Sequence, residues 1–201
     1  FKVKFPDSKK HACLTTHKGL NQLSEYLAQK AANGTTAADY NYYTNENIAH
    51  YSDMIAEEGN GGADLIVSAT GLVGHTAFID PLTKKFRANT LEEFLNLKAG
   101  YADNHRLTTA QNSGGNVALW HTPAYSVTIG PWDVIHAREH LERHDLQSPG
   151  GYSSWERMIS RQQLYGPVCK DVPASLYQLT KGTIYVSEDM ALPIEPIDKP
   201  F

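Results

Sequence analysis

The sequence predicts an α+β fold: a single domain with a mixed or antiparallel sheet and about five amphipathic helices. Its 201 residues are enough to bury one core, and a content of 41% hydrophobic and 20% charged residues is ordinary for a globular chain. Helix-period and strand-period segments are mixed without the strict β–α–β alternation of a parallel sheet. No linker-like stretch divides the chain, so we expect one domain over 1–201 with an extended, proline-rich tail over about 190–201.

Two amphipathic helices are expected in the first third of the chain. Leucines three and four residues apart mark one face of the first helix, which begins at Thr15 and stops at Asn33. The second begins at Thr44, carries polar residues in its first turn and ends at Gly59.

Three later helices are predicted from their first turns. Thr90 with Glu93 and Ser153 with Glu156 have the spacing of a capping box, in which each residue satisfies a free backbone N–H of the other. A proline at the first helical position opens a helix that we expect over 131–144.

The strands are expected where short β-branched or alternating runs are bounded by Gly, Pro or Asn. They cover 64–70, 75–79, 116–121, 124–129 and 183–187. Residues 100–115 show neither a clear period nor strong apolar content, so we expect an exposed loop there.

The charge balance excludes some classes of partner. With 18 basic and 22 acidic residues the net charge is −4, so no general attraction to nucleic acid or to anionic membranes is expected. No apolar run approaches the roughly 20 residues that a membrane helix needs. The expected partner is therefore a small-molecule or protein substrate, bound by a monomer.

Three features favour a secreted protein. Phe1 stands where a start Met would be, which indicates a processed chain, and Asn33 begins a glycosylation sequon. Cys13 and Cys169 are the only cysteines, and an isolated pair in such a chain favours one disulfide bond. The alternative is two free thiols in an intracellular protein.

The histidines suggest a metal site. His136, His140 and His144 recur every four residues on the helix expected over 131–144, so they share one face. Residues 136–140 also match the HxxEH pattern of inverted zinc peptidases, with His136 and His140 as zinc ligands. A third ligand from elsewhere, for which His121, His105 and His75 are candidates, would complete the site of a metal-dependent hydrolase. The alternative is a solvated helix face.

A larger arrangement occupies residues 13–70. A short strand ending at His17 is followed by a helix, a loop, Tyr43 at the start of a second helix that carries Tyr51, and then a strand. This order resembles the NAD-binding core of ADP-ribosyltransferases with the diphtheria-toxin-like His-Tyr-Glu layout.

The resemblance implies roles for four residues. His17 would contact the adenine ribose of NAD, Tyr43 would stack on the nicotinamide, and Tyr51 would be a second aromatic of the pocket. Glu188 would stabilise the ribosyl cation that forms as nicotinamide leaves, because a fixed carboxylate favours developing positive charge. The function it implies is that of a secreted, toxin-type ADP-ribosyltransferase or NAD glycohydrolase with NAD as substrate. A non-enzymatic secreted binding protein with exposed Tyr and Trp contacts stays open as another alternative.

Overall fold

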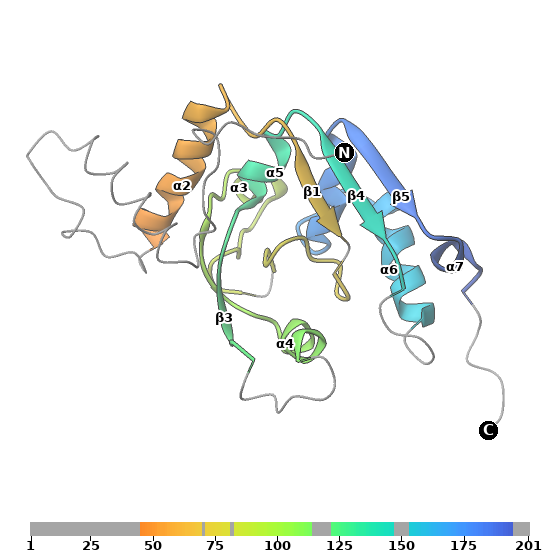
Figure 1. Ribbon diagram of the computed structural model, residues 1–201. Helices are drawn as coiled ribbons and strands as arrows, with labels where there is room; N and C mark the ends of the chain where they lie inside the picture. Colours follow the sequence, from red (N-terminus) through yellow and green to blue (C-terminus); the bar gives the residue numbers. More distant parts are fainter. Residues whose placement is uncertain (1–44, 70, 81–82, 114–121, 147–152, 195–201) are drawn as a thin grey trace, which may run out of the picture.

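A small parallel sheet organises one half of the protein. The computed structural model describes residues 45–69, 71–80, 83–113, 122–146 and 153–194. Within them the sheet has the strand order β1 (Ile66–Ala69), β4 (His140–His144) and β5 (Gly182–Val186), and both pairs of strands are parallel. Figure 1 shows the three strands side by side, with α2 at the other end of the molecule.

One face of this sheet is covered by two helical segments. Ser160 of α6 (Ser153–Tyr165) bonds His144, and Tyr177 of the 3₁₀ helix η4 (Pro173–Leu179) packs its ring against His140. Side chains of β4 alternate between buried and exposed, as expected for a strand with one covered face.

The second sheet is a pair of antiparallel strands, β2 (Gly100–Asp103) and β3 (Tyr125–Thr128), and a segment that contains a helix separates them in the chain. Helix α2 (Asn45–Glu58) packs on it through a small apolar cluster. The cluster contains Ile48, Tyr51, Ala99, Tyr101 and Val127.

Four short helices complete the described chain: α3 (Leu91–Leu95), α4 (Arg106–Asn112), α5 (Pro131–Ile135) and α7 (Glu188–Ala191). The main core lies between α3, α5, η4 and the strands. Its buried members are Ile79, Phe86, Phe94, Ala102, Val134, Leu176 and Tyr177.

The predicted fold class is confirmed, since helices and small sheets mix in one α+β fold. Several boundaries also agree with the sequence. Both halves of the capping box at Thr90 and Glu93 form, and Pro131 begins a helix. The helix expected from Ser153 and the strand expected over 183–187 correspond to α6 and β5.

Three expectations need correction. The helix expected over 131–144 ends at Ile135, and residues 140–144 form strand β4. The loop expected over 100–115 contains β2 and α4 instead. The strand expected over 75–79 is a turn closed by one isolated bridge between Thr76 and Ile79.

Two expected elements, over 15–33 and 116–121, lie outside the described residues. None of the helices that the structure describes has the length and hydropathy that a bilayer crossing needs.

Candidate functional site

A pocket of about 370 Å³ lies at the carboxyl end of β1. This volume suits a small molecule, and the carboxyl ends of strands in open α/β sheets are where ligands commonly bind. The lining comes from β1, the turn that follows it, α4, η4 and the residue after β3. Its lining comprises Ile66, Val67, Ser68, Ala69, Gly71, His75, Thr76, Ala77, Phe78, Gln111, Asn112, Ile129 and Tyr177.

A tight turn after β1 presents His75 to this pocket. Gly71 N donates to the carbonyl of His75, and Gly74 N donates to the carbonyl of Gly71. Gly74 has a φ of 76°, which favours glycine. A Cβ at Gly71 would lie less than 3.0 Å from the His75 ring, so the imidazole rests directly on the glycine backbone.

Backbone strain occurs in the same turn. Ala77 has a φ of 49°, in the left-handed region that residues with a Cβ rarely adopt. Two hydrogen bonds hold the neighbouring residues in place. Thr76 Oγ1 lies 2.8 Å from the Tyr177 hydroxyl, and Phe78 N donates to Thr128 Oγ1 at 3.1 Å. The turn is therefore fixed to η4 on one side and to β3 on the other.

The environment of His75 keeps its imidazole neutral near pH 7. The side chain is buried, and burial lowers its pKa below the ordinary value; the Asp80 carboxylate partly offsets this and His105 adds to it. Within the described part of the chain, His75 Nδ1 is buried and has no hydrogen-bond partner. A neutral imidazole with a free nitrogen in a pocket can accept a proton from a bound ligand.

The other polar groups of the lining are neutral. Ser68 Oγ is buried beside the Tyr177 hydroxyl, and Gln111 Oε1 accepts a bond from Leu72 N at 3.3 Å. Burial raises the pKa of Tyr177, so its hydroxyl stays protonated. The lining thus offers hydroxyls, amides and one imidazole, which are groups that bind hydroxylated ligands.

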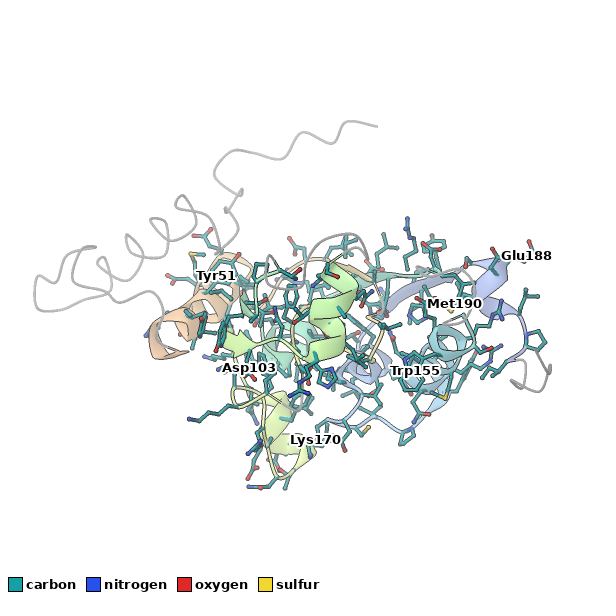
Figure 2. All side chains as sticks on the ribbon, turned by 90° about the horizontal axis from the view of Figure 1, so that it is seen from below. Tyr51, Asp103, Trp155, Lys170, Glu188 and Met190 are labelled. Atoms are coloured by element: carbon teal, nitrogen blue, oxygen red, sulfur yellow. The ribbon has the colours of Figure 1, made fainter. Side chains whose placement is uncertain are left out.

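The residues expected to bind NAD do not come together where the structure describes them. Tyr51 packs on the second sheet from α2, and Glu188 is exposed in the first turn of α7. Figure 2 shows them at opposite ends of the molecule. His17 and Tyr43 lie outside the described residues.

The two histidines expected to bind zinc lie on different elements. His136 is exposed at the end of α5, where its ring stacks on Trp132 at 4.0 Å. His140 is buried on β4, 2.6 Å from Thr180 Oγ1. In the part of the chain that the structure describes, no group of three His, Cys, Asp or Glu could hold a metal ion, and His121 lies outside that part. The zinc prediction is wrong because it required one helix through residue 144.

Comparison with known proteins finds similar structures but no matching family. No family model matches the chain. A monomeric glucosamine-6-phosphate deaminase, described as a missing link of the NagB superfamily, is similar in structure with a TM-score of 0.57 at 18% identity, over 73% of this chain and 53% of that one. The 6-phosphogluconolactonase from Trypanosoma cruzi has a TM-score of 0.50 at 12% identity, over 83% of this chain and 56% of that one. The chain therefore spans little more than half the length of either enzyme.

This fold overturns the resemblance to ADP-ribosyltransferases. The similar structures are enzymes of sugar phosphates, so the predicted transferase or glycohydrolase activity and the use of NAD are wrong. The two alternatives, a metal-dependent hydrolase and a non-enzymatic secreted binding protein, gain no support from this fold either, and the same holds for the predicted glycosylation. The disulfide bond stays a prediction because Cys13 lies outside the described residues. The secreted location also stays a prediction.

Sequence reasoning missed the importance of His75. A signal was present: two glycines, Gly71 and Gly74, directly follow a predicted strand and precede a histidine. Glycines at the carboxyl end of a strand allow a close approach of backbone and ligand. From the sequence alone, His75 is only a candidate zinc ligand. Its pocket could not be predicted, because the other lining residues come from distant parts of the chain.

Proposed function

We propose that the pocket at the end of β1 binds the sugar part of a sugar phosphate, and that His75 transfers a proton during a hydrolytic reaction of that ligand. The observation that carries the proposal is a buried, neutral imidazole with an unpartnered Nδ1 among hydroxyl and amide groups. The similarity in fold to a deaminase and a lactonase of sugar phosphates supports the choice of ligand.

The reactions of the two similar enzymes both require water and a group that transfers protons. Opening a lactone and releasing an amino group from a sugar both consume water, and both take a proton from one atom and deliver one to another. A neutral imidazole can do both in turn, and such proton transfer contributes about 10²- to 10⁴-fold to a rate. The described lining contains no Lys or Arg, so the proposal assigns the pocket to the sugar and not to its phosphate.

Binding to the full chain tests the ligand. Titration calorimetry with glucosamine 6-phosphate and with 6-phosphogluconate should show saturable binding, and ligand-induced NMR shifts should include His75 and Ser68. Absence of binding by both compounds would contradict the proposal.

A variant tests the role of His75. Release of ammonia from glucosamine 6-phosphate and hydrolysis of 6-phosphogluconolactone are measured for the wild type, His75→Gln and His136→Gln. We expect His75→Gln to lower kcat about 10²-fold or more, with a smaller change in KM. His136→Gln is the matched control, because His136 is exposed and outside the pocket lining. Equal kcat in the two variants would show that His75 transfers no proton.

A further inference from the structure

The covered face of β4 carries ionisable groups where an apolar row is usual. His140, Glu142 and His144 alternate along the strand, and their exposed fractions are 4%, 0% and 0%. Strands of a parallel sheet that are covered by helices are ordinarily rich in Val, Ile and Leu. A buried row of two imidazoles and a carboxylate therefore needs a physical explanation.

Both histidines are held in the same way. Nδ1 of His140 lies 2.6 Å from Thr180 Oγ1, and Nδ1 of His144 lies 2.7 Å from Ser160 Oγ. A Cβ at Gly182, which pairs with His140 on β5, would lie less than 3.0 Å from that ring, so glycine leaves the space that the imidazole occupies. Nε2 of each histidine is buried and has no hydrogen-bond partner among the described residues.

Glu142 lies between His140 and His144 on β4, and among the described residues only a histidine can neutralise its carboxylate. Both of its carboxylate oxygens are buried, and neither accepts a hydrogen bond from any described residue. Its one ion-pair partner within that part of the chain is His144, with Oε2 at 3.6 Å from Nε2.

Among the residues that the structure describes, the elements packed around Glu142 form no ion pair with it apart from the pair with His144. The neighbouring strands place Ser68 and Ile184 at its register. The buried titratable groups on the covering elements are Glu156 of α6 and Tyr177 of η4, and Asp145 follows His144 in the chain. Helix α6 also carries Arg157 and Arg161, whose guanidinium groups donate to the backbone carbonyls of Asp189, Ala191 and Leu192. Asp145 pairs with Arg143, whose side chain is on the exposed face of β4. The histidines of β4 itself are thus the groups that can offset the charge of Glu142.

An ionised carboxylate with neither a donor nor an opposite charge is not tolerated in a protein interior. Glu142 can avoid that state in two ways. It can carry a proton itself, or it can face a His144 ring that carries one. In either case the pair as a whole holds one proton and has no net charge.

We infer that Glu142 and His144 share one proton in the folded protein, and that this buried proton makes the packing of α6 and η4 on the sheet dependent on pH. The inference is independent of the proposed function. In the unfolded chain, free glutamate and histidine side chains titrate near pH 4.3 and 6.5, so above about pH 7.5 they hold almost no proton. The folded state then binds one proton more than the unfolded state, and stability must fall as pH rises.

Urea unfolding of the full chain at pH 6.5, 7.5 and 8.5 tests this inference. The pair contributes about a fivefold rise in the unfolding constant from pH 6.5 to 7.5, where the unfolded histidine is still partly protonated, and close to a tenfold rise from pH 7.5 to 8.5. The Glu142→Gln variant keeps the side-chain shape but removes the site of the proton, so it should lose this dependence. Glu58→Gln is the matched control because Glu58 is exposed at the end of α2. The same slope in Glu142→Gln and wild type would overturn the inference.

A second measurement does not depend on the variant folding. The ¹⁵N shifts of the His144 ring and the ¹³C shift of the Glu142 carboxyl group are recorded for the wild type between pH 6 and 9. At pH 7.5 we expect either a doubly protonated ring or a protonated carboxyl group. A neutral His144 beside an ionised Glu142 would overturn the inference.

Discussion

Two buried histidines occupy space that is available because the neighbouring residue is a glycine. His75 can lie over the turn because Gly71 has no side chain, and the same is true of His140 over Gly182. In both places the buried imidazole packs directly against the backbone of a glycine, which leaves the space that the ring occupies. Glycine at these positions therefore determines the environment, and with it the proton affinity, of a histidine.

The Gly71→Ala variant tests this dependence. The added Cβ would collide with the His75 ring, so we expect the ring to move toward solvent and its pKa to rise toward the ordinary value. An NMR titration of His75 measures the change, and binding of the sugar phosphate should weaken with it. Val73→Ala is the control, since it alters the same turn without adding an atom. An unchanged His75 titration in Gly71→Ala would show that the glycine does not set the ring position.

Elements that depend on residues close in sequence could be predicted. Elements that depend on contacts between distant residues could not. The capping box of α3 and the proline at the start of α5 act within one turn, so the sequence alone indicates them. Strand β4 has the period of a strand, but its buried positions are His and Glu, so a pattern based on hydrophobicity misses it. The pocket could not be predicted because its polar groups come from β1, α4 and η4.

One hydroxyl joins helix α2, helix α5 and the residue before β2. Ser52 of α2 donates to Asp133 of α5 at 2.8 Å and accepts from Ala99 N, next to β2, at 3.0 Å. Asp133 also accepts from Gly130 N at the start of its own helix. Burial raises the pKa of Asp133, and these donors act in the opposite direction by favouring the ionised form.

The Ser52→Ala variant should therefore be destabilised by about 2 kcal/mol. It leaves a buried carboxylate short of one donor and a buried N–H without its acceptor, and each loss costs on the order of 1–3 kcal/mol. Urea unfolding measures the difference. Ser126→Ala, whose hydroxyl bonds the half-buried Asn104 side chain at 2.9 Å, is the control and should cost less than about 1 kcal/mol. Equal destabilisation in the two variants would contradict the central role of Ser52.

At the scale of the whole molecule, one loop connects the two sheets. Residues 71–80 bond Tyr177 of η4 through Thr76 and bond Thr128 of β3 through Phe78. The same loop carries His75, while Tyr177 packs against His140 on the sheet. One buried histidine therefore lies in this loop, and another lies on the sheet beneath Tyr177, which the loop contacts.

These two histidines should destabilise the protein in mild acid. Burial is the largest cause that lowers the pKa of both His75 and His140. The unfolded chain takes up protons on these rings near pH 6.5, whereas the folded chain does so only at lower pH. Their contribution to stability is therefore complete above about pH 6.5 and is lost as pH falls through the lowered pKa of each ring.

Urea unfolding at pH 5.5 and 6.5 measures this loss. For each histidine that stays neutral in the fold, the unfolding constant rises by up to tenfold over this interval, so the two together give at most about a hundredfold rise in the wild type. We expect His75→Gln and His140→Gln each to reduce that rise, because each removes one ring that only the unfolded chain can protonate. His136→Gln should leave the rise unchanged, since His136 is exposed in the fold. A rise of the same size in His75→Gln, His140→Gln and wild type would mean that acid sensitivity arises from other groups.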